Sequence, residues 1–268
     1  MDRDSMEFLK PKLSVILTTH RRPNLLERAL KSILKRSEND FEIVLCCDGG
    51  DKATFDVACT NLRDNDIFLR VPYMKGPADS RNIGIKTARA KWICFLDDDD
   101  SFGEQHIQNF MDVIDKNQET VYYFNYQKQL ETRGAKEIEY IDSTNVDISN
   151  IHVSSLLIKN FIPINAMFFP ANILKDHSFD CRLQSHEDWD FIISLLEAGV
   201  EFQWIQSPEG SVKVHFDSSV ATRNKAAFVN LDYLSIYRKW PSSDQEIQKQ
   251  RARKVSKLGT VSVPSKSL

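Results

Sequence analysis

Residues 92–100 read WICFLDDDD, an almost wholly apolar run that ends in four consecutive aspartates. Near-continuous apolar runs of this length are typical of central strands in parallel sheets, because helices cover both faces of such strands. Open α/β sheets bind their ligands beyond the carboxyl ends of the strands, which is where the aspartates stand. The run therefore predicts an α/β fold with a functional site at the carboxyl edge of its sheet.

Short apolar runs alternate with longer helical patterns on both sides of this strand. This alternation predicts a central, mostly parallel, twisted sheet with helices on its faces. Further strands are expected at residues 13–17, 43–47, 67–71, 121–126, 166–169, 202–205 and 212–216. Helices are expected at residues 24–33, 53–62, 77–88, 107–114 and 187–199.

Two segments depart from the alternation. Residues 128–160 are polar and rich in Asn, Asp, Ser and Thr, so we expect an irregular insertion that holds or covers a substrate. Residues 221–268 are expected to form a helical, basic C-terminal extension. After Trp240 this extension contains Lys249, Arg251, Arg253, Lys254, Lys257 and Lys266, against Asp244 and Glu246 as the only acids.

The composition fits an ordinary globular enzyme. The chain has 268 residues, of which 41% are hydrophobic, which is enough for a sizeable core. A net charge of -3 gives no basic footprint, so nucleic acid is not an expected partner. No stretch is apolar enough to cross a bilayer and the five cysteines form no CxxC pattern, so we expect reduced thiols in the cytoplasm.

The four aspartates predict a metal site. Carboxylate oxygens are hard ligands that suit Mn²⁺ or Mg²⁺, and a bound cation would relieve their mutual repulsion. A solvated acidic turn is the alternative interpretation. An EF-hand loop starting at Asp97 is excluded, because its sixth and twelfth positions hold Phe102 and Gln108 instead of Gly and Glu.

Three further positions are candidates for chemistry. Arg81 lies near the start of a predicted helix and could bind anionic oxygen, although a solvated arginine is the simpler alternative. Glu187 and Asp188 open the predicted helix that follows and are candidates for a general base beside Trp189, or for simple helix capping. His215 lies in a predicted strand, where it could reach a metal or have a structural role.

Taken in order, these segments resemble the inverting family 2 glycosyltransferases, which have the GT-A fold, over roughly residues 12–220. Residues 14–22 resemble the family's opening strand and loop, and residues 80–84 its Ala-Arg-Asn-x-Gly segment. Residues 95–100 resemble its Phe-Leu-Asp-x-Asp-Asp element, and residues 186–190 its acceptor-side element. In the second strand Cys47 replaces the first of the family's paired aspartates, which leaves Asp48 to recognise the base.

The resemblance implies a division of roles within one catalytic domain, residues 1–220. Its nucleotide-binding half, about 12–100, is expected to bind the donor, and its acceptor half, about 101–220, to carry Asp188 as the base and Glu187 as an acceptor ligand. Asp99 and His215 are expected to bind Mn²⁺ or Mg²⁺. The expected donor-binding residues are Thr18, Thr19, His20, Arg21, Asp48, Arg81, Asp97 and Asp98.

The function implied is transfer of a sugar from a nucleotide diphosphate, with a UDP-sugar favoured, to a carbohydrate or lipid-linked hydroxyl acceptor in polysaccharide or glycolipid assembly. The basic extension could contact the inner face of a membrane, with a simple solvated tail as the alternative. One alternative is a non-catalytic homologue that binds nucleotide or carbohydrate. A phosphatase of the haloacid dehalogenase type is another, since Asp97-x-Asp99-x-Ser101 imitates its nucleophile motif, but that motif belongs on the first strand of its fold.

Overall fold

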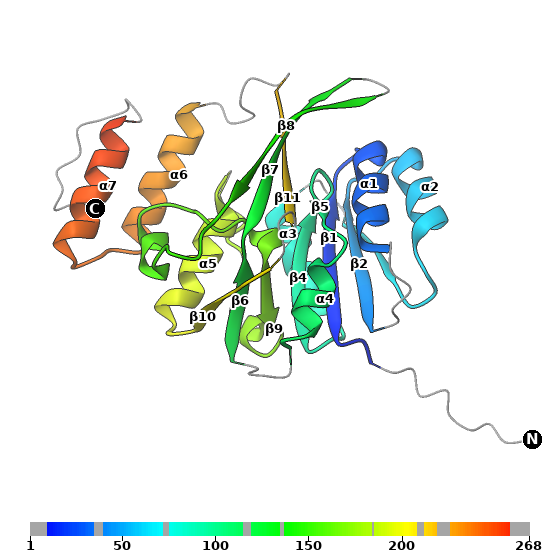
Figure 1. Ribbon diagram of the computed structural model, residues 1–268, viewed down its shortest axis with the longest axis horizontal. Helices are drawn as coiled ribbons and strands as arrows, with labels where there is room; N and C mark the ends of the chain where they lie inside the picture. Colours follow the sequence, from blue (N-terminus) through cyan, green and yellow to red (C-terminus); the bar gives the residue numbers. More distant parts are fainter. Residues whose placement is uncertain are drawn as a thin grey trace, which may run out of the picture.

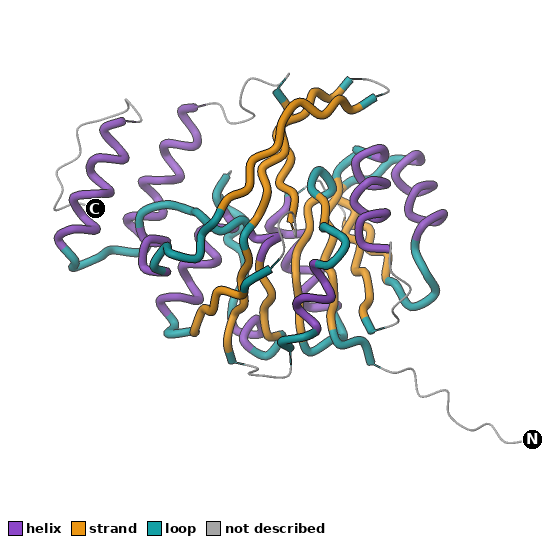
Figure 2. The backbone as a smooth tube through the Cα atoms, in the orientation of Figure 1, coloured by secondary structure: helices purple, strands orange, loops and turns teal. Residues whose placement is uncertain are grey.

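The computed structural model describes residues 10–34, 40–71, 75–114, 119–134, 137–183, 185–207, 212–218 and 226–257. Strands form two sheets with helices on both sides (Figures 1 and 2). The strands are β1 (Leu13–Thr19), β2 (Phe41–Asp48), β3 (Ile67–Val71), β4 (Trp92–Asp97), β5 (Ser101–Phe102), β6 (Thr120–Phe124), β7 (Tyr126–Arg133), β8 (Ile138–Val146), β9 (Met167–Pro170), β10 (Glu201–Ile205) and β11 (Val212–Asp217). The helices are α1 (Pro23–Leu34), α2 (Lys52–Asn61), α3 (Pro77–Thr87), α4 (His106–Met111), α5 (Glu187–Glu197), α6 (Ala226–Lys239) and α7 (Gln245–Lys257), with 3₁₀ turns η1 (Val153–Leu157), η2 (Ile164–Ala166) and η3 (Ile173–Asp176).

The larger sheet has the strand order β10-β6-β9-β4-β1-β2-β3 among the described residues. Strands β1 to β4 are parallel, as the alternating sequence predicted, and β10 is parallel to β6. Strand β9 runs antiparallel to both of its neighbours, β4 and β6. The apolar strand β4 is therefore central, and the aspartates that follow it lie at the carboxyl edge of the sheet.

Helices cover the two faces of this sheet with separate cores. Helix α1 contributes Leu26 and Leu30 to one core, where α4 adds Phe110. Helices α3 and α5 pack against the other face, and the residues they bury there include Ala78, Trp189 and Ile192. Both faces of the central strands are thus dry, which explains why β1 and β2 are buried at every position.

The prediction of an irregular segment at residues 128–160 was wrong. Strands β7 and β8 pair antiparallel as a hairpin, and β7 also pairs with β11 in a smaller sheet of order β5-β11-β7-β8. Seven of the nine positions of β8 are exposed, so this strand has no buried face. A strand without a buried face shows no apolar alternation, which is why no strand could be predicted there from the amino-acid pattern.

In the described part of the C-terminal extension, residues 226–239 and 245–257 form helices α6 and α7, which pack on the body of the protein instead of forming a solvated tail. Tyr233, Ile236 and Tyr237 of α6 and Val255 of α7 belong to the same core as α5. Arg251, one of the basic residues of this extension, is fully buried. Lys266 lies outside the described residues. Within the described ranges, no helix combines the length and apolarity needed to span a membrane.

Candidate active site

The four aspartates after β4 point to different partners. Asp97 accepts hydrogen bonds from Thr18 Oγ1 at 2.7 Å and from Arg81 Nη2 at 2.8 Å. Asp98 is fully buried, accepts from Thr19 Oγ1 at 2.7 Å and forms an ion pair with Arg22. Asp97 and Asp98 are therefore held by different guanidinium groups, Arg81 for the first and Arg22 for the second.

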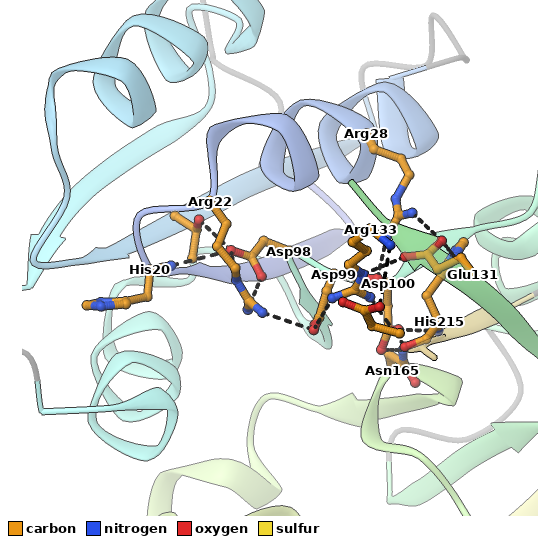
Figure 3. A network of polar contacts seen from close by, with 12 residues as sticks. His20, Arg22, Arg28, Asp98, Asp99, Asp100, Glu131, Arg133, Asn165 and His215 are labelled. Carbon is orange, nitrogen blue, oxygen red and sulfur yellow. Dashed lines mark hydrogen bonds and ion pairs between the residues drawn. The ribbon is translucent and has the colours of Figure 1, made fainter. Parts of the chain in front are cut away.

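Asp99 and Asp100 face the smaller sheet (Figure 3). Arg22 Nη1 and Arg133 Nη1 lie 3.0 Å and 3.3 Å from Asp99 Oδ2. Asp100 is buried and accepts from Asn165 Nδ2 at 2.7 Å and from the backbone N–H of His215 at 2.8 Å. Burial raises the pKa of Asp100 well above its ordinary value.

A further buried carboxylate, Glu131 of β7, links the smaller sheet to helix α1 beside this run. It accepts from Arg28 and His215 at 2.8 Å each and from Arg133 at 2.6 Å. These partners lower the pKa of Glu131 to about 2, against the opposing effect of its burial. Neither Glu131 nor Arg133 was among the predicted site residues, because both fall in the segment that was expected to be irregular.

His215 has both ring nitrogens engaged by protein groups. Nδ1 lies 2.8 Å from Glu131 Oε2, and Nε2 lies 2.9 Å from Ser101 Oγ. Burial lowers the pKa of His215. The ring is therefore held in the polar network of Figure 3. It lies beside the aspartate run, since the backbone N–H of His215 donates to Asp100.

Arg81 connects the aspartate run to the start of α5. Its Nη1 lies 2.7 Å from Glu187 Oε1, while its Nη2 contacts Asp97. The arginine side chain is buried, although a solvated position was the alternative interpretation. The adjacent carboxylates of Asp97 and Glu187 raise the pKa of Arg81 against the opposing effect of burial. A permanently charged guanidinium thus joins the two candidate halves of the site.

Asp188 follows Glu187 in the first turn of α5. Its Oδ2 accepts from Asn160 Nδ2 at 3.1 Å, and its Oδ1 from the backbone N–H of Trp189 at 2.7 Å. Burial and the Glu187 carboxylate raise the pKa of Asp188 to about 6, while Arg81 opposes the shift. A carboxylate with a pKa near the working pH is suited to accepting a proton.

A pocket of about 800 Å³ lies between these groups. Of the predicted site residues, Asp98, Asp188 and His215 do not line its wall. Asp98 instead contacts Thr19 and Arg22, two residues that do line the pocket. Arg22 lines the pocket although it was not among the predicted site residues. The lining residues are Thr18, Thr19, His20, Arg21, Arg22, Asp48, Gly76, Pro77, Ser80, Arg81, Asp97, Asp99 and Glu187.

Asp48 fixes the far wall of the pocket. Its carboxylate accepts the backbone N–H groups of Lys75 and Gly76 at 3.2 Å and 2.9 Å. Its own carbonyl oxygen lies 2.7 Å from His20 Nδ1. Gly76 has a φ of 94°, which a residue without a side chain adopts readily, directly before α3. Asp48 therefore shapes the loop that leads into the Arg81 helix.

Two non-glycine residues in the described ranges have left-handed backbone conformations, and both lie at this site. Arg21, which lines the pocket, has a φ of 51°, and His186, directly before Glu187, has a φ of 60°. Such conformations cost of order 1 kcal/mol and persist where the surroundings enforce them. They mark the two loops that present the pocket residues.

The donor set suits a hard cation only in part. Asp97 and Asp99 both line the pocket and offer carboxylate oxygens, and Mg²⁺ commonly binds one or two carboxylates together with substrate phosphates. Within the described ranges, no three His, Cys, Asp or Glu side chains converge as a ready metal cage. Asp99 could therefore hold such a cation, which would supply positive charge beside a diphosphate.

Comparison with known proteins agrees with this geometry. Residues 14–172, more than half of the chain, match the model described as Glycosyl transferase family 2. The chain belongs to glycosyl transferase family 2. The match includes the aspartate run and Arg81, whereas the α5 residues Glu187 and Asp188 lie beyond it.

Family 2 relatives resemble this chain over part of their length. An uncharacterized glycosyltransferase of Rickettsia conorii is 28% identical over 185 residues, which is 69% of this chain and 30% of the relative. The GalNAc(5)-diNAcBac-PP-undecaprenol beta-1,3-glucosyltransferase of Campylobacter jejuni is 40% identical over 93 residues, which is 34% of this chain and 30% of the relative. The chain thus matches under a third of either relative.

A solved structure of the same family type shares the fold. S. aureus TarS 1-349 in complex with UDP-GlcNAc superposes with a TM-score of 0.62 at 16% sequence identity, covering 90% of this chain and 71% of that chain. This likeness confirms the predicted GT-A fold of the family 2 chain.

Proposed function

We propose that this family 2 chain transfers a sugar from a UDP-sugar to a hydroxyl acceptor, with inversion at the anomeric carbon. The observation that carries the proposal is the position of Arg81, which contacts Asp97 and Glu187 with one guanidinium. Inverting transfer needs a donor diphosphate on one side of the sugar and a base on the other. A bridge between the aspartate run and the helix of Asp188 supports that arrangement, in which Asp99 and Glu187 line the pocket and Asp188 stands next to Glu187.

The proposed chemistry follows from charge. The leaving diphosphate gains negative charge as the glycosidic bond breaks, and Arg81 with Arg22 on the pocket wall can stabilise that charge. Asp188 removes the proton from the acceptor hydroxyl, whose oxygen attacks from the opposite face. Direct displacement needs no covalent intermediate and inverts the configuration. Glu187 would bind the acceptor.

Asp99 is the residue that we propose as the protein ligand of Mn²⁺ or Mg²⁺, with His215 beside it. When bound, the cation neutralises charge on the diphosphate. His215 already holds Ser101 and Glu131, so its proposed part as a metal ligand would require it to exchange one of these partners. Thr18, Thr19, His20, Arg21 and Asp48 would surround the nucleoside.

The relatives narrow the proposed substrates. UDP-GlcNAc binds S. aureus TarS, and the C. jejuni relative is named for a lipid-linked diphosphate acceptor. We therefore favour a UDP-sugar donor and a lipid-linked acceptor in glycolipid or polysaccharide assembly, at the cytoplasmic face of a membrane. Exposed Lys249 and Arg253 of α7 could contact anionic lipid there.

The test compares wild type with Asp188→Asn. A panel of UDP-sugars, with and without Mn²⁺, is screened by thermal shift, and the stabilising donor is then used to measure UDP release and transfer of radiolabelled sugar. Asp188→Asn is expected to keep the donor-induced thermal shift and to lose transfer. Full transfer by this variant would refute the assignment of Asp188 as the base. Absence of stabilisation by any UDP-sugar, or release of phosphate from a generic ester, would refute the function.

A further inference from the structure

Asn160, between η1 and η2, donates a side-chain hydrogen bond to the proposed base, Asp188. Its amide Nδ2 lies 3.1 Å from Asp188 Oδ2, and the other oxygen, Oδ1, is held by the N–H of Trp189. The two donors approach different oxygens from different segments of the chain. The plane of the carboxylate is therefore fixed by a residue 28 positions earlier in the sequence.

Asn160 is itself held in place by its own turn. Its Oδ1 accepts the backbone N–H of Ile162 at 3.2 Å. The amide of Asn160 thus makes two separate hydrogen bonds. Its oxygen accepts from the turn and its nitrogen donates to Asp188. An aspartate at this position could keep the first contact while losing the second.

The segment that leads to Asn160 is anchored by three helices. The carbonyl oxygens of three consecutive residues accept side-chain hydrogen bonds: Leu156 from Trp189 Nε1 of α5, Leu157 from Arg251 Nε of α7, and Ile158 from Tyr237 Oη of α6. The three distances are 2.6, 2.7 and 2.6 Å. The C-terminal helices therefore fix the backbone immediately before Asn160.

We propose that Asn160 is a positioning residue that orients the Asp188 carboxylate and favours its ionised form, with α6 and α7 holding it in place. The inference rests on the proposed function, in which Asp188 is the base. Because a hydrogen bond to the ionised form of a carboxylate favours that form, the amide opposes the effect of burial at Asp188. Other groups that act electrostatically with Asp188 are Glu187 on α5, Arg81 on α3, Asp97 on β4 and Tyr233 on α6.

The sharpest variant is Asn160→Asp, which has nearly the same shape and retains an oxygen for the N–H of Ile162. It replaces the amide donor by a second carboxylate facing Asp188. We expect the acidic midpoint of the kcat profile to rise by about two pH units and kcat at pH 7 to fall about tenfold. The KM for the UDP-sugar should not change. Lys159→Ala, an exposed neighbour in the same segment, is the matched control and should keep the wild-type profile.

A second readout separates this inference from the proposed function. Titration of ¹³C-labelled aspartate by NMR, with Asp188→Asn to assign the signal, reports the ionisation of Asp188 without any substrate. A rise of its midpoint in Asn160→Asp supports the inference even if wild type transfers no sugar, in which case only the proposed function fails. If Asn160→Asp does not fold, Asn160→Ser replaces it, with a rise of about half a unit expected. An unchanged midpoint in a folded variant, by NMR and by kinetics, overturns the inference.

Discussion

Arg81 and Glu187 lie 106 positions apart in the sequence, yet their side chains meet at 2.7 Å. The same guanidinium contacts both carboxylate oxygens of Asp97, at 2.8 and 3.0 Å. A planar guanidinium presents several donors in fixed directions, which an ammonium group cannot reproduce. The geometry of this bridge, beyond its charge, is therefore the property to test.

Arg81→Lys is expected to lower kcat/KM for sugar transfer by about 100-fold, because one ammonium cannot serve Asp97, Glu187 and a diphosphate together. Steady-state kinetics with the UDP-sugar measures the effect. Arg182→Lys is the matched control, since Arg182 is exposed and pairs with Asp180. Equal kinetics for Arg81→Lys and wild type would contradict the role assigned to the bridge.

The pH dependence of transfer should report Asp188. Burial and Glu187 raise the pKa of this carboxyl to about 6, and only the ionised form can accept the acceptor's proton. Activity is therefore expected to fall about tenfold per pH unit below that value and to level off above it. A profile of kcat from pH 5 to 8 tests the direction. Activity that rises as pH falls through 6 would exclude Asp188 as the base.

Asp99→Ala should remove the dependence of donor binding on metal. If Asp99 shares a cation with the diphosphate, Mn²⁺ will increase the thermal shift caused by the UDP-sugar in wild type and will have no effect in the variant. Asp142→Ala, an exposed carboxylate on β8, is the control and should retain the Mn²⁺ effect. A preserved Mn²⁺ effect in Asp99→Ala would place the metal elsewhere.

His106 makes a prediction about stability in acid. Its fully buried ring lies against Phe102, Phe124 and Phe168, and burial lowers its pKa to about 3. The unfolded chain, with a histidine pKa of about 6.5, takes up a proton that the folded chain does not. Stability should therefore be full above pH 6.5 and fall by about 1.4 kcal/mol per pH unit below it.

His106→Phe should remove this contribution. Urea unfolding at pH 7 and at pH 5 measures the unfolding free energy of both proteins. Between these two pH values the variant should lose less unfolding free energy than wild type. The exposed His152→Phe is the control and should lose as much stability as wild type. Equal losses in wild type and His106→Phe would show that this ring is not the titrating group.

Arg251→Met is expected to destabilise the chain by about 3 kcal/mol, because it leaves buried carbonyl oxygens without their donor. The guanidinium donates to the carbonyl oxygens of Leu157 and Trp240 at 2.7 and 2.8 Å. Thermal or urea unfolding provides the measurement. Arg253→Met, on the exposed side of α7, should unfold like wild type. Similar stability of both variants would mean that Arg251 is not a structural clamp.

Much of the fold and part of the site followed from the sequence. The apolar run of β4, the aspartates after it and the segment of Arg81 have local patterns, so their positions at one edge of the sheet could be predicted. Asn160 and Glu131 have no such pattern. Both residues matter because of hydrogen bonds and ion pairs to partners distant in the sequence. Such partners cannot be inferred from an isolated polar residue in a polar stretch.

Arg251 is a further residue whose environment could not be predicted from the sequence. In a stretch with several Lys and Arg residues it was counted only as one more basic residue, although its guanidinium donates to carbonyl oxygens of Leu157 and Trp240. Composition cannot separate a buried cation from an exposed one, because burial depends on which backbone groups lie nearby. The sequence therefore indicated a basic segment but not the buried position of this residue.

The reversed direction of β9 has a consequence for how the pocket is assembled. In an all-parallel sheet, the residues that enter a strand lie at the edge opposite the ligand. Because β9 is antiparallel to β4, the N-terminal end of β9 lies at the same edge of the sheet as the aspartates at the C-terminal end of β4. Asn165, just before β9, therefore reaches Asp100, and the chain that carries Asn160 arrives from the same side. One inverted strand thus brings a connecting segment into contact with two carboxylates, Asp100 and the proposed base Asp188.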